Sequence, residues 1–128
     1  MSKGKVLALS VALAMGLSSA AALAEGDAKA GAKVFKKRCF ACHTINKGGK
    51  NKVGPNLWGV FGRASGTMEG FKFSDAMTEA GITWDDATMA QYLAKPKDMV
   101  PGTKMAFAGL RTEKQIANVI AYLKQATQ

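Results

Sequence analysis

The pentapeptide at residues 39–43 constrains the fold of this chain more than any other stretch. It reads Cys-Phe-Ala-Cys-His and holds the only two cysteines and the only histidine of the 128 residues. At this spacing two thiols can bond to the vinyl groups of one haem, and the next residue supplies an imidazole to the iron. We therefore expect one covalent haem c per chain, held by Cys39, Cys42 and His43.

Other uses of a C-x-x-C pair compete with haem. The pair can be a redox-active dithiol, half of a zinc site or a short disulfide. Structural zinc takes four Cys or His ligands, and this chain has three such residues in all. A thioredoxin-like dithiol accompanies a βαβ pattern, which the sequence does not show. Haem is favoured, and an exported dithiol protein without haem stays as an alternative that predicts a colourless product.

Residues 1–24 have the pattern of a secretory signal peptide. Lys3 and Lys5 precede an apolar run at residues 6–17, and Ala22-Leu23-Ala24 supplies a small-x-small cleavage site. A retained membrane anchor is the alternative, but the run is shorter than the roughly 20 residues that span a bilayer. We expect cleavage before Glu25, export to the periplasm and a single domain over residues 25–128.

Positive charge dominates the predicted mature chain. The whole sequence has 18 basic and 9 acidic residues, and only two of the basic ones, Lys3 and Lys5, fall in the leader. Such a surplus favours an acidic partner and fast, salt-sensitive association. Nucleic acid is the competing partner, but an exported chain rarely meets it.

Export also bears on the two cysteines. An oxidising compartment favours a disulfide between free thiols, and haem attachment would consume those thiols.

The sequence predicts an all-α fold of helices joined by loops. Asp27, Ser74 and Thr112 are expected N-caps, and Pro96 is expected to end the helix before it. Gly31, inside the first helix, suggests a close crossing by another helix, and the last helix is the natural partner. The predicted segments are 27–38, 74–79, a helix from 85 or 86 to 94, a turn at 97–100, and 112–126.

Residues 46–70 are predicted to be a long loop. They contain seven glycines and only short apolar groups. A loop of this length is unusual in a small domain, but a haem gives it a large apolar body to wrap. If the loop folds back, the Pro55 carbonyl lies near His43 and orients its ring by accepting the second N–H.

A single histidine leaves the second axial position of the iron to another residue type. Met77 and Met89 fall on predicted helices, where packing is the usual role of methionine. Met105 follows the Pro101-Gly102 turn, which can aim a side chain inward, and it is the leading candidate on local grounds. A thioether ligand raises the reduction potential, and two protein ligands leave no open site for oxygen or peroxide. The methionines beyond the leader are Met68, Met77, Met89, Met99 and Met105.

An ordered set of motifs resembles class I cytochrome c, close to the mitochondrial and bacterial cytochrome c2 type. The resemblance runs without gaps over nearly all of the predicted mature chain. It implies the small cytochrome c fold, His43/Met105 ligation and a carrier of single electrons, not an enzyme. The motifs are Gly31 and Phe35, Cys39-x-x-Cys42-His43-Thr44, Gly54-Pro55-Asn56-Leu57, Phe61-Gly62-Arg63, Gly81-Ile82-Thr83-Trp84, Tyr92-Leu93, Pro101-Gly102-Thr103-Lys104-Met105, Phe107-Ala108-Gly109 and Ala121-Tyr122-Leu123.

The resemblance also implies roles for further residues around the haem. The Pro55 carbonyl accepts the His43 N–H, and Tyr92 and Thr103 form hydrogen bonds around the axial methionine. Trp84 and Arg63 stabilise the buried propionates. A docking rim around the exposed haem edge would meet acidic surfaces of a bc1-type donor and of an oxidase, reaction centre or other acceptor, with the carrier a monomer. This docking rim consists of Lys33, Arg38, Lys52, Lys97, Lys104 and Arg111.

Four positions depart from the family pattern. Phe73 stands where mitochondrial members usually carry a tyrosine that bonds a propionate, and Met77 replaces an asparagine of an internal polar network. Asp98 and Thr112 replace lysines beside the docking rim.

A haem peroxidase or ligand-binding sensor remains the second hypothesis, but it needs an open sixth position, which Met105 would close.

Overall fold

The computed structural model describes residues 25–128, so the predicted signal peptide at residues 1–24 lies outside the described part. Apart from one isolated antiparallel bridge between Ala64 and Thr83, the regular elements there are all helices. The predicted all-α fold is therefore confirmed. No helix in this range is both long and apolar enough to cross a membrane. The helices are α1 (Ala28–Arg38), α2 (Asp75–Glu79), α3 (Asp86–Ala94), α4 (Pro96–Met99) and α5 (Glu113–Ala126).

Side-chain caps fix where four of the helices begin. Asp27, Ser74 and Thr112 each accept a hydrogen bond from a backbone N–H in the first turn, as predicted. Asp85 caps α3, and Thr88 completes a capping box by bonding back to the Asp85 N–H. α4 begins at Pro96, one residue earlier than predicted, because proline suits the first position of a helix.

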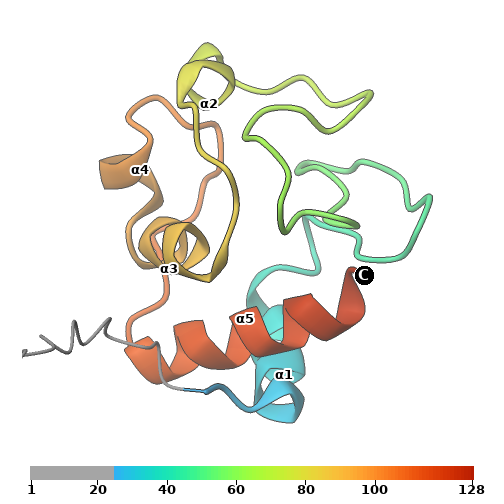
Figure 1. The fold of residues 1–128 in the computed structure, drawn as a ribbon, viewed down its shortest axis with the longest axis vertical. Helices are drawn as coiled ribbons and strands as arrows, with labels where there is room; N and C mark the ends of the chain where they lie inside the picture. Colours follow the sequence, from blue (N-terminus) through green and yellow to red (C-terminus); the bar gives the residue numbers. More distant parts are fainter. Residues whose placement is uncertain (1–24) are drawn as a thin grey trace, which may run out of the picture.

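The first and last helices cross closely. Figure 1 shows α1 and α5 against each other at one side of the molecule. A Cβ on Gly31 would overlap the Asn118 carbonyl of α5 and lie 2.9 Å from Cβ of Tyr122. The Phe35 and Tyr122 rings pack beside this point with centroids 5.5 Å apart. The crossing that Gly31 predicted is confirmed, because only a residue without a side chain fits there.

The long loop at residues 46–70 is held by backbone hydrogen bonds to distant segments. Gly59 N donates to Thr127 O at 2.7 Å, next to the C-terminal end of α5. Gly62 N donates to Trp84 O at 2.7 Å, and Trp84 N donates to Arg63 O at 3.0 Å. In Figure 1 this loop lies across the interior from α3 and α4. The loop therefore forms one wall of the molecule, with helices opposite.

Candidate haem-binding site

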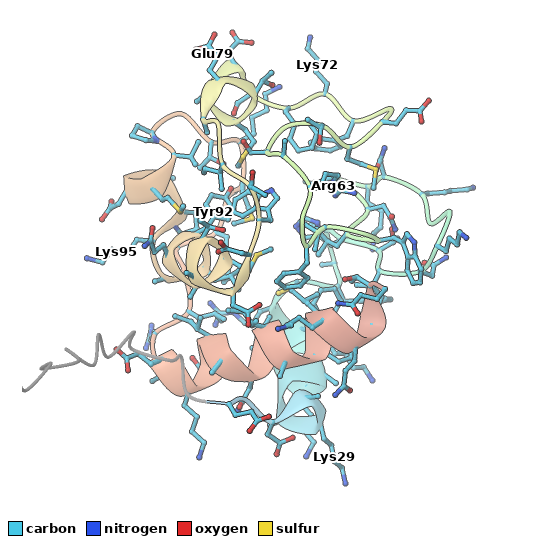
Figure 2. The ribbon with its side chains drawn as sticks, viewed as in Figure 1. Lys29, Arg63, Lys72, Glu79, Tyr92 and Lys95 are labelled. Atoms are coloured by element: carbon cyan, nitrogen blue, oxygen red, sulfur yellow. The ribbon has the colours of Figure 1, made fainter. Side chains whose placement is uncertain are left out.

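A cavity of about 240 Å³ lies between the long loop and the helices. Its lining is mainly apolar and includes buried core residues such as Phe35, Leu93 and Val119. Figure 2 shows Arg63 on the loop and Tyr92 on α3 facing this interior from opposite sides. All nine residues predicted to bind the cofactor line the cavity: Cys39, Cys42, His43, Pro55, Arg63, Trp84, Tyr92, Thr103 and Met105.

The two thiols are positioned by the end of α1. Cys39 N donates to Phe35 O at 2.8 Å, and both Cys42 N and His43 N donate to Cys39 O at 3.0 Å. The chain thus makes one further turn after the helix, which carries both cysteines and the histidine to the cavity. Both cysteines are half-buried and free. Burial raises the pKa of the Cys39 thiol to about 11, against the opposing charge of Arg38.

His43 is held by the backbone of the long loop. Its Nδ1 lies 2.8 Å from the Pro55 carbonyl oxygen. Because a carbonyl can only accept, Nδ1 carries the hydrogen and Nε2 keeps its lone pair. Burial lowers the pKa of His43, the Pro55 hydrogen bond opposes this, and the nearby Lys52 charge lowers it further. The ring is therefore a neutral imidazole with one nitrogen free to ligate a metal.

The turn beneath His43 depends on residues that the sequence analysis did not assign a role. Gly54 leaves the room that the imidazole occupies, since a Cβ there would lie 2.8 Å from both ring nitrogens. Asn56 is buried, and its side-chain amide donates to Thr44 Oγ1 at 2.7 Å and to Asn46 O at 3.0 Å. Its position inside the Gly-Pro-Asn-Leu motif was the only signal available.

Met105 lies on an extended segment supported from α3. The hydroxyls of Tyr92 and Thr103 are 2.7 Å apart, and Met105 N donates to Thr103 Oγ1 over a longer 3.4 Å. Burial raises the pKa of Tyr92, and its bond to Thr103 opposes this. Tyr92 therefore stays a neutral phenol that links α3 to the methionine segment.

Arg63 and Trp84 form the polar corner of the cavity. Arg63 Nη1 donates to Trp58 O at 2.8 Å, and burial lowers the pKa of its guanidinium. Trp84 is buried, with its ring centroid 5.2 Å from that of Tyr92. One guanidinium nitrogen is thus engaged by the protein, while further N–H groups remain for an anionic ligand group.

Two of the four positions that depart from the family pattern, Phe73 and Met77, also line the cavity. Phe73 packs edge-on against Phe71, with centroids 4.8 Å apart. Met77 is buried on α2, whose N-cap is Ser74. Each places an apolar side chain where the family resemblance led us to expect a polar group. The wall near α2 is therefore more apolar than the family pattern implies.

The donor set fits a haem and does not fit the competing cofactors. Two thiols, a neutral imidazole and the thioethers of Met68, Met77, Met89 and Met105 line one apolar cavity, and a Cβ on Gly54 would fill the space that the His43 ring occupies. Within residues 25–128, no cluster of three or more His, Cys, Asp and Glu side chains is arranged to hold a metal ion. A buried thiol with a raised pKa is also a poor dithiol nucleophile.

The docking-rim residues are all exposed, but they do not all lie at the cavity. Only Arg38 and Lys104 line it. Arg38 stacks on the Phe107 ring at 5.5 Å, and Lys104 Nζ lies 3.4 Å from the carbonyl oxygens of Lys72 and Phe73. Lys33, Lys52, Lys97 and Arg111 do not line the cavity.

The fold and site define a small helical protein with a cavity for one covalently bound haem. Comparison with known proteins gives the family, because residues 28–127 match the model for cytochrome c. Cytochrome c of Gibberella zeae is 50% identical over 106 residues, which cover 83% of this chain and 100% of that protein. Cytochrome c of Theileria parva is 53% identical over 103 residues, covering 80% and 89%. Cytochrome c2 of Blastochloris viridis is 51% identical over 108 residues, covering 84% of each.

This chain belongs to the cytochrome c family. It therefore binds one covalent haem c and carries electrons, and it is not an enzyme. Its partners are redox proteins of respiratory or photosynthetic complexes.

Proposed function

We propose that residues 25–128 form a periplasmic carrier of single electrons between membrane redox complexes, with His43 and Met105 as axial ligands. The main support is that one cavity collects both thiols, the His43 imidazole and the Met105 thioether. Met68, Met77 and Met89 line the cavity too, and Met105 is preferred because the family resemblance implies it and Thr103 holds its segment. When bound, the haem supplies an Fe(II)/Fe(III) couple, whose potential a thioether ligand raises. The protein's own part is to hold these groups still and keep water away from them.

Each proposed ligand is held by a neighbour on another segment. Pro55 fixes the orientation of the His43 ring through its carbonyl oxygen. Thr103 and Tyr92 link the Met105 segment to α3. Arg63 and Trp84 are proposed to bind the propionates, for which Arg63 has free N–H groups. With both axial positions filled, the site has no place for oxygen or peroxide.

The periplasmic location rests on the leader. The relatives include cytochromes c of eukaryotes and a bacterial cytochrome c2, so they do not select a compartment. A charged start, a short apolar run and Ala22-Leu23-Ala24 favour export with cleavage after Ala24. Mass spectrometry of the haem-bearing protein from a periplasmic extract tests this. A chain that begins at Glu25 is expected, and a membrane-bound chain that keeps residues 1–24 would contradict the proposal.

Docking is proposed to use the positive docking rim against an acidic surface of a bc1-type donor and of an oxidase, reaction centre or other acceptor. Opposite charges steer encounter and speed association, and salt screens them. The six exposed cations of the rim support this, although three of them also make contacts within the molecule.

Stopped-flow oxidation of the reduced holoprotein by an acidic oxidase tests the docking role. The second-order rate should fall steeply as ionic strength rises. Lys97→Gln should lower the low-salt rate a few-fold and flatten its salt dependence. Lys29 points away from the interior in Figure 2. Lys29→Gln should therefore change the low-salt rate and its salt dependence only slightly. A salt-independent wild-type rate would overturn the proposed docking.

A further inference from the structure

Two large apolar side chains stand out on the surface close to the haem-attachment turn. Phe40 is 55% exposed and Val53 is 81% exposed, and they are the only exposed large hydrophobic residues within 25–128. Val53 also lines the mouth of the haem cavity. A single exposed apolar residue is ordinary on a protein surface. Two such residues mark an interaction surface only if they lie together.

Contacts between residues 40–42 and 52–54 join them. Lys52 Nζ donates to Phe40 O at 2.7 Å and lies 4.8 Å from the centroid of the Phe40 ring. Gly54 N donates to Cys42 O at 2.9 Å, so the two chain segments run together here. We name Phe40, Lys52 and Val53 the Phe40 patch.

The Phe40 patch is held rigidly by its backbone. Phe40 N donates to Phe35 O at 3.0 Å, and Phe40 lies between the two cysteines that attach the haem. Lys52 N donates to Gly54 O at 2.9 Å. Because the backbone here is fixed before binding, covering these residues costs this chain little backbone entropy. Aromatic anchors of this kind are typical centres of protein interfaces.

The sequence segment that carries the Phe40 patch is strongly basic, and this charge selects the type of partner. Residues 28–68, which carry the patch, contain nine basic and no acidic residues, whereas residues 69–128 contain seven of each. A second copy of this chain would bring like charges together. A protein surface with an apolar spot among carboxylates is complementary to it.

We propose that Phe40 and Val53, with Lys52 held over the Phe40 ring, form the apolar centre of the surface that docks an acidic redox-partner protein. This inference rests on the proposed carrier function and deepens it. The cations of the docking rim speed the encounter, and the Phe40 patch keeps the complex together once salt has screened those charges. Phe40 is thus a specificity-determining residue of docking.

Phe40→Ser, Val53→Ser and the double variant test the inference as holoproteins. Their rates with an acidic oxidase are measured at low and high ionic strength, and complex formation is measured by calorimetry. Ferricyanide serves as an oxidant that needs no docked surface. The double variant should bind the oxidase and react with it about five- to tenfold less at both ionic strengths. Its salt dependence should match that of the wild type. Phe40→Ser alone, which leaves the cavity lining intact, should keep the ferricyanide rate, and its free energy of unfolding should fall only by the loss of the Lys52–Phe40 contact.

Ala80→Ser, an exposed apolar change at the end of α2, is the matched control and should leave oxidase binding unchanged. If the double variant binds the oxidase as tightly as the wild type does, the role of the Phe40 patch is overturned and the carrier function stands. If the double variant also loses wild-type binding to phosphatidylglycerol vesicles, the patch is a membrane contact instead. A wild type that reacts with ferricyanide but with no oxidase or bc1 complex would overturn the carrier function and the docking inference together.

Discussion

The Nδ1 atom of His43 lies 2.8 Å from the carbonyl oxygen of Pro55, twelve residues further along the chain. This bond fixes both the tautomer and the direction of the ring from a loop that has no regular structure of its own. It also requires the chain at Gly54 to pass directly beside the imidazole. The geometry of the ligand therefore depends on the packing of that loop.

Gly54→Ala is expected to displace His43 or the loop beside it. The added Cβ would lie 2.8 Å from both ring nitrogens, and such overpacking costs about 1–3 kcal/mol. Denaturant unfolding of the holoprotein, with the yield of attached haem, measures the effect. Gly48→Ala is the control, because a Cβ there meets nothing within 4 Å and only the positive φ of 71° resists it. Equal or greater damage from Gly48→Ala would contradict this account.

Gly31→Ala should be among the most destabilising single changes in the chain. Its Cβ would overlap the Asn118 carbonyl of α5, and backbone atoms cannot move aside as a flexible side chain does. We expect a loss of about 3 kcal/mol or more in the free energy of unfolding. Lys36→Ala, on the exposed side of α1, should stay within about 0.5 kcal/mol of the wild type. A mild effect of Gly31→Ala would mean that the helices do not cross as closely as the structure shows.

Asp85 should give α3 a stabilisation that acid removes. Hydrogen bonds from the Thr88 backbone N–H and hydroxyl hold the Asp85 pKa below its ordinary value of 3.8. The folded state thus prefers the charged form of Asp85. The stabilisation is therefore complete above the pKa that Asp85 has in the unfolded state, and it disappears as the pH falls through the pKa of Asp85 in the folded state. Asp85→Asn keeps an N-cap oxygen but cannot titrate.

Unfolding of the wild type and of Asp85→Asn, followed from neutral pH into acid, checks the Asp85 prediction. The wild type should be the more stable protein at neutral pH, and its advantage should shrink below about pH 4. A difference that stays constant down to acid pH would show that the charge of Asp85 plays no part.

Tyr92→Phe should loosen the Met105 segment without disturbing the core. The variant removes the hydroxyl that lies 2.7 Å from Thr103 Oγ1, at a cost of about 1 kcal/mol. Added imidazole should then bind the oxidised holoprotein about fivefold more tightly, since opening of the segment becomes easier. Tyr122→Phe, at the α1–α5 crossing, is the control and should leave imidazole affinity unchanged. An unaltered affinity in Tyr92→Phe would remove Tyr92 from the support of Met105.

Local signals explain what the sequence alone predicted. The caps Asp27, Ser74 and Thr112 and the breaker Pro96 act within one helical turn, so helix bounds were predicted to about one residue. The α3 capping box lacks the usual sequence signature, because Thr88, instead of Glu or Gln, returns the second hydrogen bond. The thiols and the histidine were visible because their spacing is itself the signal.

Contacts between distant segments could not be predicted in the same way. Asn56 supports the turn under His43, and Gly59 joins the long loop to Thr127. These contacts follow no helical period, and a loop of glycines carries little pattern. The Phe40 patch has no sequence signature for a related reason: the C-x-x-C spacing assigns no role to Phe40, and its exposure is a property of the folded surface.

A spectroelectrochemical titration of the holoprotein tests the central claim most directly, with Met105→Leu and Met99→Leu as a matched pair. The wild type should titrate as a single one-electron couple, and its oxidised form should show the weak long-wavelength band of an iron–thioether bond. Met105→Leu should lose that band, because Met105 is the proposed ligand, and Met99→Leu should keep it, because Met99 does not line the cavity. An oxidised wild type that lacks the band and binds peroxide readily would contradict the account, since its iron would then have an open position.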